Sequence, residues 1–87
     1  MKTMDHPRIR DLAISGTGFV FDPHTGSTFT ANETGLEILR ALGEGLEAEA
    51  IVARLCARFE VDAAEAERDL GEFLLVLRRD ELLEAKP

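Results

Sequence analysis

The chain has 87 residues, a formal net charge of −7, one cysteine, and 45% hydrophobic against 31% charged residues, an ordinary composition for one folded domain with one core. A single cysteine excludes an internal disulfide, and no apolar run approaches the roughly 18 residues of a membrane span. Because the first residues also lack the apolar stretch of a signal peptide, we expect a cytoplasmic protein with no membrane contact.

The first third of the chain predicts β-strands over residues 9–31, after a flexible tail over residues 1–8. Leu12 and Ile14 alternate with their neighbours, which is typical of a strand with one buried face. The aromatic and β-branched run at residues 19–21 indicates a second strand, separated from the first by a glycine-containing turn.

The segment Asp22-Pro-His-Thr-Gly26 predicts a tight turn. The Asp22 side chain can accept hydrogen bonds from the turn, the proline fixes its own φ, and Gly26 can adopt a positive φ. Residues 27–30 then form the returning strand of a hairpin. Since a hairpin is marginally stable alone, we expect it to pack on helices.

Residues 32–80 predict three helices, and residues 81–87 a C-terminal apolar latch and tail. Asn32 is a good N-cap for the first helix, and a Gly-Glu-Gly segment ends it. The second helix is expected over about residues 47–59. A capping box at Asp62 begins the third helix. The expected core stripes are Leu36, Ile38, Leu39 and Leu42; Ile51, Val52, Leu55 and Phe59; and Ala66, Leu70, Phe73, Leu74 and Leu77. Strands followed by helices predict an α+β domain, in which a small antiparallel sheet covers a three-helix cluster.

No catalytic or metal-binding motif stands out. His6 and His24 have no ligand partner at a usable spacing, and zinc needs three or four converging ligands. Cys56 has apolar neighbours, which predicts a buried, unreactive thiol. The helical carboxylates lie opposite the apolar stripes and are expected on a solvated face, among them Glu47, Glu49, Glu65 and Glu72. We therefore expect no catalytic residue, no metal and no cofactor.

Several segments together resemble the PqqD-like family, also called RiPP recognition elements. They are Phe19-Val-Phe-Asp-Pro-His-Thr-Gly26, Phe29-Thr-Ala-Asn-Glu-Thr-Gly-Leu-Glu-Ile-Leu39, Ile51-Val-Ala-Arg-Leu55 with Phe59-Glu-Val-Asp62, and Glu67-Arg-Asp-Leu70 with Phe73, Leu74 and Leu77. The resemblance covers residues 12–83, and the Asn-Glu-Thr-Gly-Leu segment after the hairpin is its most specific part.

The resemblance implies a winged-helix-like arrangement of a three-stranded antiparallel sheet followed by three helices. It also implies a non-catalytic chaperone that captures the leader segment of a ribosomally made precursor peptide and presents it to a modifying enzyme. Because the chain has no tryptophan or tyrosine, it looks less like the members dedicated to pyrroloquinoline quinone than like free-standing members encoded beside relatives of HPr kinase. The modifying enzyme is then expected to be a radical SAM or an HPr-kinase-related protein.

In that family the leader adds as a strand to the third strand and lies against the third helix, here residues 27–30 and 62–79. One flank of the last helix also has features of a groove: Gly71 costs about 1 kcal/mol relative to alanine, Leu75 is apolar but off the core stripe, and Arg78 can pair with an acidic side chain. The alternative is that this flank packs on the protein's own sheet. The expected peptide-binding residues are Ser27, Thr28, Phe29, Thr30, Ala64, Glu67, Arg68, Gly71, Leu75 and Arg78.

Two other classes of function compete with peptide binding. The first is a winged-helix DNA-binding transcriptional regulator, but residues 32–87 hold fourteen acids and seven bases and residues 1–31 three of each, so the helical half carries the whole negative charge. An acidic surface repels phosphate backbones, so we expect no nucleic-acid partner. The second is an enzyme whose site has no recognisable motif. The oligomeric state is expected to be a monomer or a dimer paired through the edge strand.

Overall fold

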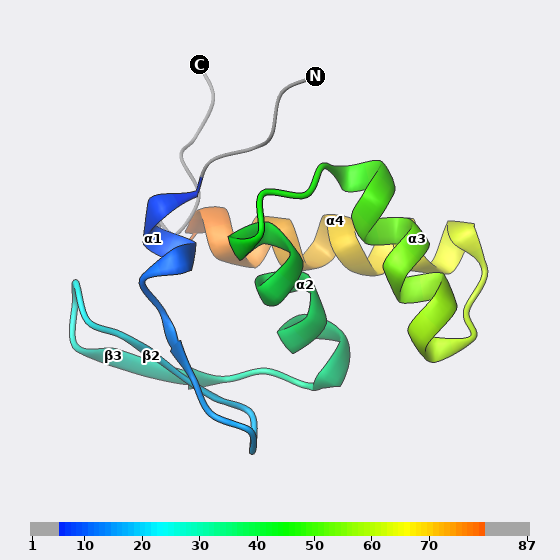
Figure 1. The fold of residues 1–87 in the computed structure, drawn as a ribbon. Coiled ribbons are helices and arrows are strands. Elements are labelled where there is room, and N and C mark those ends of the chain that lie inside the picture. The colour runs from blue at the N-terminus through cyan, green and yellow to red at the C-terminus, as the bar shows by residue number, and fades with distance from the viewer. Residues whose placement is uncertain (1–5, 80–87) are drawn as a thin grey trace.

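The described part of the chain has seven helices and strands, in which the three strands precede the three long helices as predicted and a short helix comes before them. The computed structural model describes residues 6–79. Its elements are α1 (Pro7–Arg10), β1 (Ala13–Ile14), β2 (Phe19–Asp22), β3 (Ser27–Thr30), α2 (Glu33–Gly43), α3 (Ala48–Phe59) and α4 (Ala63–Arg79) (Figure 1). The predicted α+β class is confirmed, while the latch expected at residues 81–87 lies outside the described residues.

The three strands form one antiparallel sheet in the order β1-β2-β3. Alternation along β2 places Val20 and Asp22 inside and Phe19 and Phe21 outside. The predicted turns are confirmed, because Gly18 has φ 98° and Gly26 has φ 78°. The hairpin therefore presents β3 as one outer strand of the sheet.

Side-chain caps begin two of the three long helices where the sequence predicts them. The Gly35 amide donates to Asn32 Oδ1 (2.8 Å) at the start of α2. The Glu65 amide donates to Asp62 Oδ1 (2.8 Å) at the start of α4. α3 ends at Phe59, and its C-cap residue Glu60 adopts a left-handed conformation with φ 57°. Each cap satisfies a backbone group that the helix itself leaves without a partner.

The core lies between the sheet and the helices, and α2 is its centre. Helices α1 and α3 both pack on α2, and α4 packs on α3 (Figure 1). Cys56 is half-buried at the edge of the core rather than fully enclosed. The fully buried apolar residues are Ile9, Leu12, Val20, Leu36, Ile38, Leu39, Ala41, Leu42, Ile51, Leu55, Ala66, Leu70 and Leu77. Most of the predicted stripe residues are therefore core residues, and the remaining ones are half-buried around them.

The N-terminal segment differs from the prediction. Residues 7 and 8 belong to helix α1 rather than to a flexible tail, and the first strand is only Ala13–Ile14. Pro7 starts the helix, because a proline at the first helical position loses no hydrogen bond. Ile9 is 2% exposed and so anchors this single turn in the core. The expected tail was therefore wrong at residues 7 and 8, and the expected strand was wrong at residues 9–12, while residues 1–5 lie outside the described residues.

Candidate functional site

The outer edge of β3 pairs with no other strand among residues 6–79. In an antiparallel pair, successive residues point their N–H and C=O groups alternately toward the partner strand and away from it. The Ala31 amide donates to the Gly18 carbonyl (2.9 Å), so residue 31, and with it residues 29 and 27, faces β2. Thr28 and Thr30 therefore point their backbone groups outward, where no further strand follows among residues 6–79.

The side chains of β3 divide between the two faces of the sheet. Phe29 is half-buried and packs against the core, as expected of a residue that faces inward. Thr28 and Thr30 are exposed beside Phe21 and Phe19, which are 42% and 58% exposed. An extended peptide on this edge would send alternate side chains toward the helices and toward this outer face.

The predicted flank of α4 faces α3. Glu67 and Gly71 line a hollow of about 360 Å³ together with Ala48, Glu49 and Val52 of α3. A second hollow contains Arg78 with His6 and residues of α2 and α3, and neither hollow includes a residue of β3. Ala64, Arg68 and Leu75 are exposed. Neither hollow joins the predicted helix residues to the predicted strand residues, and the exposure of this flank contradicts the alternative that it packs on the protein's own sheet.

The opposite flank of α4 faces the start of α2, which follows β3 in the chain. A hollow of about 270 Å³ is lined by residues that follow β3 and by residues of α4, which are Asn32, Thr34, Gly35, Ile38, Asp69, Glu72, Phe73 and Val76. A Cβ atom built on Gly35 would lie 3.0 Å from Phe73 Cε1 and 3.3 Å from Ala31 Cβ. Glycine at residue 35 therefore allows α4 to approach the start of α2 closely. Sequence reasoning missed this hollow, although Gly35 belongs to the most specific motif.

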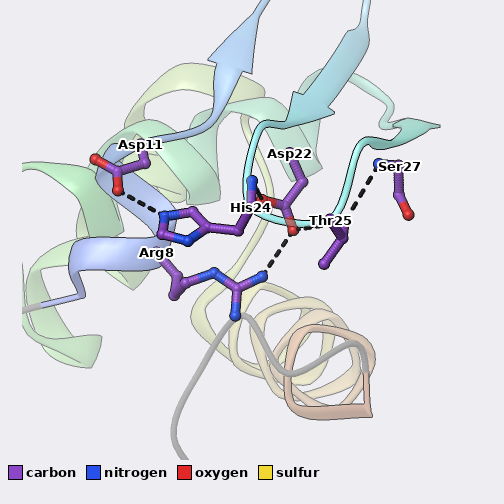
Figure 2. A network of polar contacts seen from close by, with 6 residues as sticks. All are labelled: Arg8, Asp11, Asp22, His24, Thr25 and Ser27. Atoms are coloured by element: carbon purple, nitrogen blue, oxygen red, sulfur yellow. Dashed lines mark hydrogen bonds and ion pairs between the residues drawn. The ribbon is translucent and has the colours of Figure 1, made fainter.

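A polar network ties the start of β3 to α1 (Figure 2). Arg8 Nη2 donates to Asp22 Oδ2 (2.8 Å), the His24 amide donates to Asp22 Oδ1 (2.9 Å), and His24 Nε2 lies 2.8 Å from Asp11 Oδ2. Burial alone would raise the pKa of Asp22, but the hydrogen bonds from His24, Arg8 and Thr25, with the Arg8 charge, lower it below its ordinary value. The sequence predicted the role of Asp22 in the turn but not its pairing with Arg8.

A second buried carboxylate, Glu37, joins α2 to α3. It is 6% exposed and accepts hydrogen bonds from Arg54 Nη1 (3.3 Å) and Arg58 Nη1 (2.9 Å). Arg54 also donates to Glu44, and this hydrogen bond lowers the pKa of Glu44. The two arginines that a DNA-binding interpretation would need are therefore both engaged within the protein.

Neither a metal site nor a membrane span is found in the described residues. No group of three or more histidine, cysteine, aspartate or glutamate side chains could hold an ion among residues 6–79. No helix in that range is long and apolar enough to cross a bilayer.

Comparison with known proteins gives one family and two similar solved structures. Chain TbiB1, solved in complex with the TbiA(beta) leader peptide, is 34% identical; the match covers 100% of this chain and 99% of that chain, with a TM-score of 0.77. Lasso peptide synthetase B1, complexed with the leader peptide, is 24% identical over 79% of this chain and 82% of that chain, with a TM-score of 0.68, and supports the fold alone. No curated protein matches the chain. The family model described as "Coenzyme PQQ synthesis protein D (PqqD)" matches residues 18–83, well over half of the sequence, and the chain therefore belongs to the PqqD family.

Proposed function

We propose that this protein is a non-catalytic chaperone that captures the leader segment of a ribosomally made precursor peptide by β-strand addition. The observation that carries the proposal is the outward-facing backbone of Thr28 and Thr30 at the edge of β3. Support comes from the family and from the 34% identical TbiB1, which was solved with a leader peptide. The chaperone would present the bound peptide to a modifying enzyme in the cytoplasm, a radical SAM or an HPr-kinase-related protein.

Strand addition divides affinity and specificity between two parts of the peptide. Main-chain hydrogen bonds to Thr28 and Thr30 give affinity for an extended segment of almost any sequence. Alternate side chains of the peptide point toward the helices, where pockets give specificity. The strand that we propose as the template consists of Ser27, Thr28, Phe29 and Thr30, and within it Thr28 and Thr30 offer the outward-facing backbone groups. The two flanks of α4 are then the candidate surfaces for the side chains.

The experiment compares two substitutions at Thr28. The TbiA(beta) leader peptide and peptides selected from a random displayed library serve as probes, and fluorescence anisotropy gives Kd. Thr28→Pro removes one outward-facing N–H without removing a hydrogen bond between β2 and β3, as proline is tolerated on edge strands. We expect Kd to rise by about tenfold or more, the loss of about 1.4 kcal/mol that one good hydrogen bond supplies.

The matched control is Thr28→Val, which keeps the N–H and the preference for strands. It should bind selected peptides with the Kd of the wild type. Both variants should keep the thermal midpoint of a folded domain. If no peptide from either source binds the wild type, or if Thr28→Pro stays folded and binds as tightly, the proposed function is wrong.

A further inference from the structure

We propose that the hollow between the start of α2 and α4 selects peptides in which a lysine or arginine lies next to an apolar side chain. The inference rests on the proposed function and names the chemistry of its substrate. It also chooses between the two flanks of α4, because the predicted flank carries Arg78 and would favour an acidic peptide instead.

The position of the hollow fits an extended peptide on β3. Asn32, which lines the hollow, follows the last residue of β3 by two positions. A strand added along Thr28 and Thr30 that continues past the end of β3 would run toward Asn32 at this opening. Its volume of about 270 Å³ is below the ~300–1,000 Å³ of pockets that enclose whole small molecules. The hollow is therefore suited to one or two side chains.

The floor of the hollow is apolar. Ile38 is 1% exposed, and Phe73 and Val76 are half-buried beside it. Gly35 leaves this floor open, since a side chain there would meet the Phe73 ring. An apolar peptide side chain placed here would cover surface that is now partly in water, which is favourable in proportion to its area.

Two carboxylates form the rim on the α4 side. Asp69 is half-buried and Glu72 is exposed, and residues three apart lie on one face of a helix. Neither has an ion-pair or hydrogen-bond partner among residues 6–79, whereas the buried Asp22 and Glu37 each accept from an arginine. No lysine, arginine or histidine lines the hollow. The rim is therefore a negative charge that the fold does not neutralise.

A covering peptide must compensate this charge. A neutral peptide would remove water from the two carboxylates without replacing its hydrogen bonds, which is unfavourable, and an acidic peptide would add repulsion. A lysine or arginine supplies both a countercharge and donors. The net charge of −7 also attracts cationic peptides from a distance. Selection for a basic residue follows from both effects.

The test selects random peptides from an mRNA-display library on three forms of the full chain. These are the wild type, Asp69→Asn with Glu72→Gln, and the control Glu47→Gln with Glu49→Gln. The control removes the same charge from the start of α3, where Glu47 and Glu49 are exposed. We expect enrichment of lysine and arginine on the wild type and the control, and loss of this enrichment on the Asp69/Glu72 variant.

Affinities then give the size of the effect. For a basic peptide selected on the wild type, Kd should rise about fivefold in the Asp69/Glu72 variant, as expected for partly exposed ion pairs. It should change less than about twofold in the control, and the difference should shrink as salt screens the charges. Thermal melts check that both variants remain folded.

The outcomes separate this inference from the proposed function. If peptides are enriched without a basic preference, or if the Asp69/Glu72 variant keeps that preference, the inference is wrong while peptide binding stands. Enrichment of acidic peptides that Arg78→Gln abolishes would assign recognition to the other flank. If no peptide is enriched on any form, the proposed function fails, and this inference with it.

Discussion

Asp22 and Glu37 are the two carboxylates that the described fold buries, and each accepts a hydrogen bond from an arginine distant in sequence. A buried charge without a partner is strongly unfavourable. Each buried carboxylate therefore needs its arginine partner for the folded state to be stable. The Arg8–Asp22 pair joins α1 to the hairpin, and the Glu37 pairs join α2 to α3. Each of these two buried carboxylates therefore links two neighbouring elements through its arginine partners.

Glu37→Gln should destabilise the fold by about 1–3 kcal/mol, because two arginines lose a charged partner inside the protein. Urea unfolding followed by circular dichroism measures the change. Glu44→Gln is the control, since Glu44 also pairs with Arg54 but is exposed, and its effect should be smaller. An unchanged free energy of unfolding for Glu37→Gln would show that its pairs do not hold α2 and α3 together.

Asp22 should make the free energy of unfolding depend on pH in the acid range. Its folded pKa lies below the ordinary value of 3.8, so the unfolded chain takes up the proton first. The contribution is present above pH 3.8 and is lost as pH falls through the lower folded pKa. Asp22→Asn should therefore be less stable than the wild type at neutral pH, and the difference should narrow below that pH.

Urea titrations of both proteins across the acid range measure this narrowing. Asp11→Asn, on the exposed side of the same network, is the control and should leave the acid dependence of the wild type almost intact. A constant difference between wild type and Asp22→Asn at every pH would contradict the role assigned to the Asp22 carboxylate.

At the scale of elements, the packing of α4 leaves different amounts of room around two glycines, Gly71 in α4 and Gly35 in α2. Nothing lies within 4 Å of a Cβ atom built on Gly71 of α4, whereas one built on Gly35 of α2 would meet the Phe73 ring of α4 at 3.0 Å. Both glycines lie within helices, so the same substitution has different consequences at the two positions. Only Gly35 is needed for the approach of two elements.

Gly71→Ala should stabilise the protein by about 0.5–1 kcal/mol, because alanine is the better helix former and its methyl group has room. Gly35→Ala should bring no such gain, since the Phe73 ring and Ala31 must move. Chemical denaturation of the two variants in parallel measures the contrast. Equal stabilisation by both would mean that α2 and α4 are not closely packed at Gly35.

The elements that the sequence predicts correctly are those with local signals. Asn32 and Asp62 cap the helices that they were expected to cap, and the turn at Asp22 has the expected hydrogen bond. α1 was missed because Ile9 is the only buried apolar residue in its single turn. Helical periodicity located the core stripe of α4, but both flanks of that stripe are equivalent on a helical wheel. Which flank faces the start of α2 depends on tertiary packing, as do the arginine partners of Glu37, 17 and 21 residues away.

At the scale of the whole molecule, the negative charge belongs to the helical half. Residues 32–87 hold fourteen acids and seven bases. The arginines of α3 that could contact a nucleic acid, Arg54 and Arg58, already bind Glu37. Among residues 6–79, α3 therefore offers no free arginine for the electrostatic contacts that give proteins their general affinity for phosphate backbones.

We accordingly expect no shift of a DNA duplex in a gel at low salt, the condition that most favours weak electrostatic binding. A basic winged-helix domain run beside it is the positive control. A salt-sensitive shift of a defined duplex would contradict this expectation and would revive the regulator interpretation.

The anchoring of β3 at both ends affects how much conformational entropy is lost when a peptide binds. Its start is fixed through the Arg8–Asp22 pair and the Thr25 contact with the Ser27 amide, and its end through Ala31 and the Asn32 cap. A template held in this way is preorganised, so the ordering entropy of association falls on the peptide alone. Loosening the anchor at Arg8 should therefore weaken peptide binding even though Arg8 pairs with Asp22 at the hairpin turn and not with the outer edge of β3.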